Sequence, residues 1–197
     1  MSPPQVRVYL ACSLDGFIAG PDHDLSWLPS YADDSPAALA RDTGSIDYET
    51  FIADVGAMLM GRRTYDVVRG FGGDWHYGDL PIHVATTRAL DDAPPAAVKA
   101  VRGSIATLIT EAKAAARGKN LYLDGGDLIR QAADADLIDH FIITYAPVAL
   151  GRGTPLFGLI QNYYHLEITG SYRHDYGMLQ VHARPRRPKD ATPATAP

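Results

Sequence analysis

The chain has 197 residues, of which 46% are hydrophobic and 21% charged, and its formal net charge is −5 at pH 7. These values are typical of a globular protein with a sizeable core, and the negative charge gives no general case for nucleic-acid binding. The only cysteine, Cys12, excludes an internal disulfide and a cysteine-based zinc site, and its apolar neighbours predict a buried thiol. The first residues lack the features of a signal peptide, and no apolar run is long enough to span a membrane. We therefore expect a cytoplasmic protein without nucleic-acid or membrane partners.

Short apolar runs alternate with helical patterns along most of the chain. Apolar and β-branched residues predict strands at Val6–Cys12, Ala57–Met60, Pro81–Thr86, Val98–Val101, Leu121–Leu123 and Ile138–Val148. Helices are predicted within residues 36–54, with an apolar stripe of Tyr48, Ile52 and Val55, and at Tyr65–Val68, Ser104–Ala116 and Leu128–Ala133. Two closing strands, His165–Tyr172 and Met178–Arg184, flank a hairpin turn at Asp175–Gly177.

This order of elements predicts an α/β fold. Strands that alternate with helices form a mostly parallel sheet, and the closing hairpin adds an antiparallel edge. The chain shows no internal repeat, so we expect a single domain over residues 1–185 and a disordered tail rich in Pro and Ala over residues 186–197.

The turn Gly125-Gly126 is the first candidate for ligand binding. It joins a predicted buried strand to a predicted helix, and the backbone N–H groups at a helix start attract phosphate. Asp124 and Asp127 flank the turn, and their charge would oppose a bound diphosphate unless Asp127 caps its own helix. Positive φ angles or close packing are the structural alternative for the two glycines.

The turn Gly61-Arg62-Arg63-Thr64 also follows a predicted strand. Guanidinium groups bind phosphate through forked hydrogen bonds, and Thr64 could cap the helix that follows. The corner Thr86-Thr87-Arg88 offers a further hydroxyl and guanidinium after the third predicted strand. Several arginines favour NADPH, with its additional 2′-phosphate, over NADH. An exposed basic turn paired with Asp66 or Asp74 is the alternative.

Four segments together resemble the dihydrofolate-reductase-like superfamily. The segments are Ala11–Gly20, Met60–Asp66, Asp124–Ile129 and Pro147–Phe157, and they occur in the family's order between Val6 and Arg184. The resemblance is strongest to the branch related to the C-terminal reductase domain of bifunctional riboflavin-biosynthesis deaminase–reductases. It implies a three-layer α/β fold and an NADPH-dependent oxidoreductase that works by hydride transfer. A deaminase half is excluded here, because its zinc motif needs more than one cysteine.

The resemblance also implies roles for individual residues. The residues implied to bind NADPH are Ala11, Ile18, Gly61, Arg62, Arg63, Thr64, Thr86, Thr87, Arg88, Gly125, Gly126, Asp127 and Leu128. Dihydrofolate reductases carry a carboxylate and, one turn later, an aromatic residue on the helix before the Gly-Arg strand. These positions correspond to Asp47 as the catalytic acid, with Glu49 as its competitor or a solvated Asp47 as the alternative, and to Phe51, which with Trp27 would contact the substrate.

The expected substrate is a small heterocycle similar to a pterin or a ribosylaminopyrimidine, as in 5-amino-6-(5-phosphoribosylamino)uracil reductases. An authentic dihydrofolate reductase and a nucleotide-binding module without catalysis are the alternatives. Trp75, His76 and Tyr77, in a glycine-rich loop, suit either a substrate lid or a plain surface loop, and Asp15 suits a structural turn. The histidines lack the spacing of metal ligands, so no metal is expected. The run Ile138–Val148 could support a homodimer.

Overall fold

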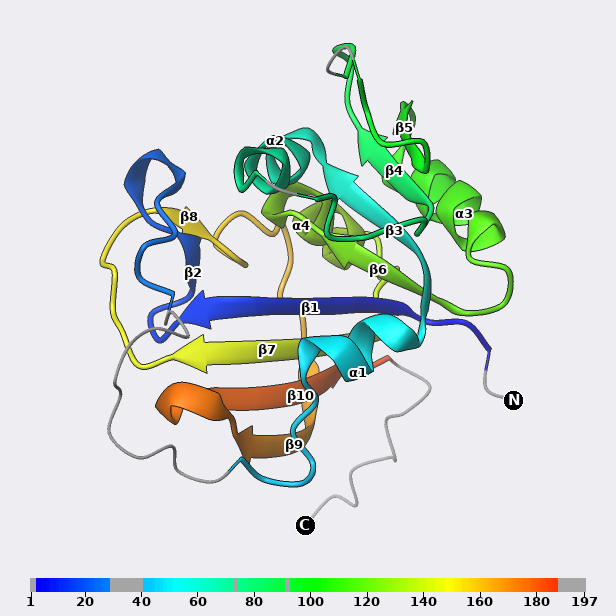
Figure 1. Cartoon of the computed structure of the whole chain (residues 1–197). Coiled ribbons are helices and arrows are strands. Elements are labelled where there is room, and N and C mark those ends of the chain that lie inside the picture. Colours follow the sequence, from blue (N-terminus) through cyan, green and yellow to red (C-terminus); the bar gives the residue numbers. More distant parts are fainter. Residues whose placement is uncertain (1–2, 29–40, 73, 91–92, 188–197) are drawn as a thin grey trace.

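A single large sheet organises the molecule (Figure 1). The structure is a computed structural model and describes residues 3–28, 41–72, 74–90 and 93–187. In this part of the chain, the eight strands of the sheet lie in the order β5-β4-β3-β6-β1-β7-β10-β9. Their bounds are β1 Val6–Ser13, β3 Val55–Gly61, β4 Ile82–Ala85, β5 Val98–Val101, β6 Asn120–Asp124, β7 His140–Ala146, β9 Leu166–Arg173 and β10 Leu179–Pro185.

The strands from β5 to β7 run parallel, and β10 and β9 complete the sheet in antiparallel orientation. The predicted fold class, a mostly parallel sheet with an antiparallel C-terminal hairpin, is confirmed. The turn between β9 and β10 is the short 3-10 helix η2, Asp175–Gly177. Within the run Ile138–Val148, β7 pairs with β1 and β10 and so lies inside the sheet, whose edge strands are β5 and β9; the homodimer stays a prediction.

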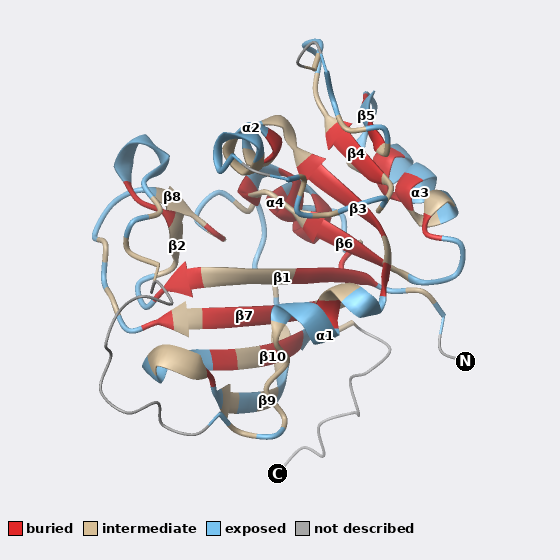
Figure 2. Cartoon of the chain, viewed as in Figure 1, coloured by how far each residue is buried: buried red, intermediate tan, exposed pale blue. Residues whose placement is uncertain are grey.

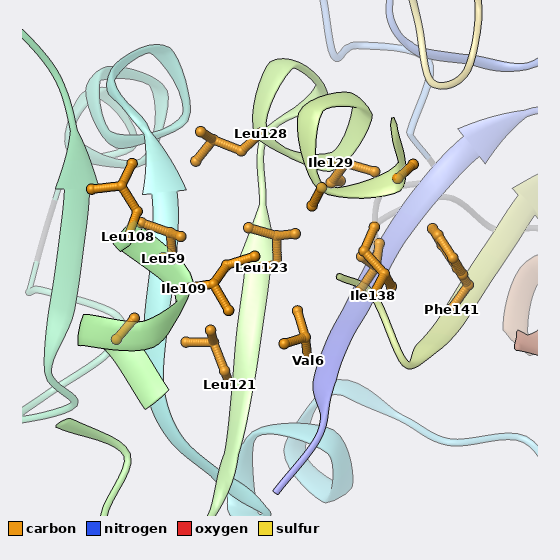
Figure 3. Packing of buried hydrophobic residues seen from close by; sticks show 14 of the residues in the cluster. Val6, Leu59, Leu108, Ile109, Leu121, Leu123, Leu128, Ile129, Ile138 and Phe141 are labelled. Atoms are coloured by element: carbon orange, nitrogen blue, oxygen red, sulfur yellow. The ribbon is translucent and has the colours of Figure 1, made fainter. Parts of the chain in front are cut away.

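Helices cover both faces of the sheet. On one face, α3 (Ile105–Ala115) and α4 (Gly126–Asp134) pack on apolar side chains of β1, β3, β6 and β7, among them Leu59, Leu123 and Phe141 (Figure 3). On the other face, α1 (Tyr48–Ala53) and α2 (Arg62–Gly70) contribute Phe51 and Tyr65 to a second apolar cluster. The strands between the two clusters are therefore largely buried (Figure 2).

The first helix differs from its prediction. Residues 36–40 lie outside the described residues, residues 41–47 are not helical, and α1 covers only Tyr48–Ala53. The predicted stripe of Tyr48, Ile52 and Val55 is also wrong, since Val55 already belongs to β3 and the buried side chain of the helix is Phe51. The side chain of Gln180, completely buried, bonds the backbone N–H and C=O of Ile46, and so holds the loop that leads into α1.

A small two-stranded sheet beside β1 pairs β2 (Phe17–Ala19) with β8 (Thr154–Pro155), and the 3-10 helix η1 (Pro21–His23) follows β2. The carboxylate of Asp15 accepts hydrogen bonds from the Ser13 hydroxyl and from the backbone N–H groups of Leu150 and Gly151. These bonds lower the pKa of Asp15 to about 2. The predicted structural role of Asp15 is confirmed, because it joins the β1–β2 turn to the glycine-rich loop.

The C-terminal tail is described only at its start. Arg187 forms ion pairs with Asp136 and Asp139, so residues 186–187 lie against the domain, while residues 188–197 lie outside the described residues. Of the helices in the described ranges, none is long and apolar enough to cross a membrane. Within the same ranges, no three His, Cys, Asp or Glu side chains are grouped so that they could hold a metal ion.

Candidate active site

A cleft of about 850 Å³ lies along the carboxyl ends of the parallel strands. Its walls come from the residues that follow β3, β4, β5 and β6, together with parts of β1 and β2. Open α/β sheets bind their ligands at this edge, because the loops that leave neighbouring strands meet there. The topology therefore brings the two phosphate-suited turns of the sequence into one cavity.

Two helices begin at the cleft without a side-chain cap. Gly61 is the N-cap of α2 and Gly125 that of α4, and neither helix receives a hydrogen bond from a capping side chain. By contrast, Asp47 caps α1 and Ser104 caps α3. The first N–H groups of α2 and α4 have no partner within their own helices, and so they remain available to an anion. Thr64, the predicted cap of α2, lies inside that helix instead, and Asp127 does not cap α4.

The two helix starts touch each other at Gly125. This residue has φ +96°, and a Cβ atom there would lie 3.0 Å from Oγ1 of Thr64 and 3.2 Å from the backbone nitrogen of Gly61. At Gly126, a Cβ would lie 2.8 Å from Cδ1 of Ile18. Larger residues at either position would fill the space between the turns, so the glycine pair allows both helix starts to face one point of the cleft.

Arginines also line this cleft. Arg62 forms an ion pair with Asp66 at 2.6 Å and donates a hydrogen bond to the carbonyl of Ala89, whereas Arg63 is exposed. The pairing with Asp66 is the one anticipated for a structural basic turn, and it fixes Arg62 beside the corner after β4. Arg102 holds that corner in place by donating hydrogen bonds to the carbonyls of Thr86 and Thr87.

The charge of Asp127 is offset within the protein. Arg130, whose side chain is buried, forms an ion pair with Asp127 and donates to the carbonyl of Pro155 at 2.7 Å. Asp127 therefore faces the solvent with a guanidinium beside it, and its repulsion toward a bound anion is reduced. Arg130 also connects α4 to the small β2–β8 sheet through Pro155.

Asp124, the last residue of β6, has a different environment. It is half-buried at the cleft wall, its Oδ1 accepts the N–H of Gly125 at 2.7 Å, and the hydroxyl of Tyr122 lies 3.4 Å from its Oδ2. Burial raises the pKa of the Asp124 carboxyl to about 6, although these two hydrogen bonds oppose the rise. A carboxyl group with a pKa near neutrality can both accept and donate a proton at physiological pH.

Four tyrosines, here called the tyrosine wall, lie around Asp124: Tyr9, Tyr48, Tyr77 and Tyr122. Tyr9, Tyr77 and Tyr122 line the cleft, and Tyr48 packs edge-on against Tyr9 with a centroid distance of 6.1 Å. Tyr48 and Tyr77 interact through their hydroxyl groups, and burial is the main cause that raises the pKa of Tyr48 to about 12. The hydroxyl of Tyr122 donates to the carbonyl of Tyr9 at 2.8 Å. The wall is thus uncharged, aromatic and internally hydrogen-bonded.

The structure places every residue predicted to bind the cofactor in the lining of this cleft. Their role in binding remains a prediction, but their spatial convergence was not evident from any one motif. Three other predicted site residues do not line the cleft, namely Asp47, Phe51 and Trp27.

Each of these three has a structural environment instead. Asp47 caps α1 by accepting the N–H of Thr50 and pairs with Arg41, and hydrogen bonds from both residues lower its pKa to about 2. Phe51 is buried beneath the wall, stacked on Tyr9 at 4.6 Å. Trp27 donates its indole N–H to the carbonyl of Asp24.

Sequence reasoning noted Asp124 only as an unfavourable charge and did not assign Arg102. Of the tyrosine wall it named only Tyr77 for the site, as part of a possible substrate lid, and Tyr77 lines the cleft whereas Trp75 and His76 do not. The sequence did contain a signal for the position of some of these residues. Tyr122 and Asp124 are two residues apart in one strand and therefore share a face. Arg102 directly follows β5, as Arg88 lies near the end of β4. The desolvation of Asp124 had no sequence signal, because it depends on segments far apart in the chain.

Comparison with known proteins agrees with this architecture. The model of the RibD C-terminal domain matches residues 4–179. The uncharacterized protein YwjB of Bacillus subtilis is 31% identical over 168 residues, which cover 83% of this chain and 88% of that protein. A crystal structure from Shewanella sp. PV-4, described as a candidate riboflavin biosynthesis protein, shares 30% identity and superposes with a TM-score of 0.78 over 93% of this chain and 99% of its own.

A more distant structure extends the comparison of the fold. The diaminohydroxyphosphoribosylaminopyrimidine deaminase/5-amino-6-(5-phosphoribosylamino)uracil reductase of Thermotoga maritima superposes with a TM-score of 0.61 at 15% identity. The match covers 93% of this chain but 57% of that longer one. At this identity the similarity concerns the fold alone.

Proposed function

This chain belongs to the family of RibD C-terminal domains, and from that premise we propose that it is an NADPH-dependent reductase of a small heterocyclic substrate. The observation that carries the proposal is the convergence of two uncapped helix starts at one glycine contact within an arginine-lined cleft. Such a site suits a dinucleotide diphosphate, since the N–H groups of both helices and the nearby guanidinium groups all favour anions.

The residues present suit NADPH in a definite arrangement. The first turns of α2 and α4 would hold the diphosphate, and the missing Cβ atoms at Gly125 and Gly126 leave room for it. The corner Thr86-Thr87-Arg88, braced by Arg102, would hold the 2′-phosphate. Ala11 and Ile18, which line the cleft and of which Ile18 lies against Gly126, would contact the nicotinamide.

When bound, NADPH supplies the hydride, and the protein has to orient the substrate and deliver a proton. We assign the proton to Asp124. Its Oδ2 has only a long contact with Tyr122, and its pKa of about 6 keeps part of the carboxyl protonated near neutral pH. The tyrosine wall would orient a planar ring and exclude water. Asp47 is less suited to this role, because it is ionised at neutral pH and lies outside the cleft lining.

A titration with NADPH and, in parallel, NADH tests the proposal, with the increase of nicotinamide fluorescence as the signal. We expect saturable NADPH binding that is at least about tenfold tighter than NADH binding, because only NADPH carries the additional phosphate. Oxidation of NADPH is then followed with a panel of heterocycles that includes dihydrofolate. No binding of either nucleotide would refute the proposal. NADPH binding without oxidation by any substrate of the panel would favour a nucleotide-binding module.

A further inference from the structure

Asp66 places a carboxylate among the arginines of the cleft. It belongs to α2 and lines the cleft together with Arg62 and Arg88. Each of its two oxygens faces a different arginine: Oδ1 accepts the Nε–H of Arg62 at 2.6 Å, and Oδ2 lies 3.9 Å from Nη2 of Arg88. One carboxylate therefore joins the first turn of α2 to the corner after β4.

This pairing limits what Arg62 can offer to a ligand. A guanidinium group binds a phosphate most strongly through two adjacent nitrogens, either Nε with Nη2 or Nη1 with Nη2. In Arg62, Nε donates to Asp66 and Nη1 donates to the carbonyl of Ala89. Both of these nitrogen pairs thus already have one member engaged. A forked bond from Arg62 to a phosphate therefore requires the release of either the carboxylate or the carbonyl.

Asp66 is the partner that Arg62 can release more easily. The side chain of Asp66 is 45% exposed and that of Arg88 is 72% exposed, so water replaces these ion pairs at little cost in free energy. A carboxylate also moves by rotation about side-chain bonds, whereas the carbonyl of Ala89 belongs to the main chain that follows the corner held by Arg102. Exchange at Arg62 therefore displaces the Asp66 side chain and leaves the corner in place.

The charges at this corner favour such an exchange. A phosphate monoester carries a charge of about −1.5 to −2 at pH 7, more than a carboxylate, and so it attracts the guanidinium groups of Arg62 and Arg88 more strongly. The nearby charge of Asp66 repels the same phosphate and lowers its affinity. Asp66 can thus be displaced by a phosphate, but it weakens the binding that results.

We propose that Asp66 is an internal competitor for the 2′-phosphate of NADPH, which holds the guanidinium group of Arg62 until the phosphate takes its place. The inference rests on the proposed reductase function and makes Asp66 a specificity-determining residue for the cofactor. Its carboxylate limits the preference for NADPH over NADH, because it opposes only the nucleotide that carries the additional phosphate. The same repulsion favours release of the oxidised cofactor after hydride transfer.

Asp66→Asn tests the proposal, because it removes the charge of an exposed side chain and keeps its size. NADPH, NADH, adenosine 2′,5′-bisphosphate and adenosine 5′-monophosphate are each titrated by calorimetry into the full-length wild type and variant. We expect the variant to bind the two 2′-phosphorylated ligands about tenfold more tightly than the wild type, and the other two within about twofold of it. Unchanged or weaker binding of the 2′-phosphorylated ligands overturns the proposal, and weaker binding would mean that Asp66 positions Arg62 for the phosphate.

Two control variants separate a local effect from a general effect of charge. Asp127→Asn removes another carboxylate of the same cleft, in the first turn of α4, and should change the affinities for NADPH and NADH by the same factor. Asp79→Asn, at an exposed carboxylate outside the cleft lining, should change neither affinity. If Asp66→Asn tightened NADPH and NADH equally, Asp66 would compete with the diphosphate, and its assignment to the 2′-phosphate would be wrong.

The proposed function and this inference fail in different ways. If NADPH binds and Asp66→Asn leaves the ratio of the NADPH and NADH affinities unchanged, the reductase proposal stands and the role of Asp66 is wrong. If the wild type binds neither dinucleotide, the reductase proposal is refuted. Inorganic phosphate titrated into wild type and Asp66→Asn then still reports whether Asp66 competes with an anion, and equal phosphate affinities overturn that role as well.

Discussion

The carboxyl group of Asp124 lies half-buried in the wall of the cleft, and its Oδ2 has only a long contact with the hydroxyl of Tyr122. We predict that Asp124→Asn, which keeps the shape but removes the proton, lowers kcat by about 10²- to 10⁴-fold while NADPH binding persists. In the wild type, turnover that needs the protonated carboxyl should fall as the pH rises through about 6, and Asp124→Asn should lose this dependence. Steady-state kinetics between pH 5 and 8 measure both effects.

Asp79→Asn, at an exposed carboxylate outside the cleft lining, is the control for the loss of a charge.

The substitution Asp124→Asn should affect the stability of the protein in the opposite direction to its activity. Because burial raises the pKa of Asp124 above 3.8, its ionised form costs the native state free energy as the pH rises through about 6. Asp124→Asn should therefore unfold at no lower temperature than the wild type at pH 8. A clear drop in its melting temperature would assign Asp124 a structural role.

At Gly125, both the positive φ angle and the close contacts that a Cβ atom would make require glycine. We predict that Gly125→Ala destabilises the protein by more than about 2 kcal/mol and weakens NADPH, because the new Cβ strains a positive φ and pushes against Thr64 and Gly61. Gly118→Ala is the matched control, since Gly118 has φ +86° but open space around its Cβ. It should cost only about 1 kcal/mol and leave NADPH affinity unchanged. Denaturant unfolding and NADPH titration of both variants distinguish the effect of the positive φ angle, which the two positions share, from the effect of the close contacts, which only Gly125 has.

At the scale of elements, α1 is short, and its start depends on Asp47. We predict that Asp47→Ala lowers the stability of the protein through the lost cap, with kcat changed less than about threefold. Asp47→Ser, which restores a capping oxygen, should recover most of the stability. A loss of kcat in both variants, comparable to that of Asp124→Asn, would instead support the catalytic role that the sequence suggested for Asp47.

Strands β7 and β10 each carry a histidine, His140 half-buried and His182 buried. His140 and His182 meet edge-on at 5.6 Å, and burial, Arg7 and His182 together lower the pKa of His140 to about 4. The neutral ring is therefore the form that the native state stabilises. The contribution of the neutral His140 ring to the free energy of unfolding is complete above the unfolded pKa of about 6.5 and is lost as the pH falls through about 4.

We accordingly predict that the wild type loses about 2 to 3 kcal/mol of stability from His140 between pH 7 and pH 4. His140→Gln should flatten this part of the stability profile, whereas His165→Gln, at an exposed position on the other side of the hairpin, should not. Urea unfolding at a series of pH values measures the difference. Identical profiles for wild type and His140→Gln would mean that other groups carry the acid sensitivity.

For the whole molecule, binding at the cleft couples elements that are distant in sequence, since β1, β3, β4 and β6 all contribute to its walls. A ligand that binds only the native state stabilises it by mass action, by about 2.7 kcal/mol at a hundredfold excess over Kd. We predict that saturating NADPH raises Tm by about 5 to 10 °C and that NADH at the same concentration raises it much less. Scanning calorimetry tests this, and equal shifts for both nucleotides would remove the assignment of the 2′-phosphate to the corner after β4.

Much of the fold could be predicted because its signals are local. The strands β1, β3, β5, β6 and β7 and the helix α3 lie within a few residues of their predicted positions, since period and turn chemistry act over short segments. The start of α2 was misplaced, because Thr64 has the chemistry of a cap but packs against Gly125 from another turn. The helix before β3 was predicted too long, because residues 41–47 form a loop that Gln180 holds at Ile46, and its apolar stripe was wrong because Val55 belongs to the strand.

The sequence by itself determined the order of strands and helices and the two anion-suited turns, because periodicity, glycine and arginine express their preferences within a few residues. Only the tertiary structure decided that both turns meet at one point, that Asp47 caps a helix outside the cleft lining, and that Asp124 lies desolvated beside tyrosines from four separate segments. Burial and charge depend on neighbours that the topology brings together from distant parts of the chain, and no local pattern records them.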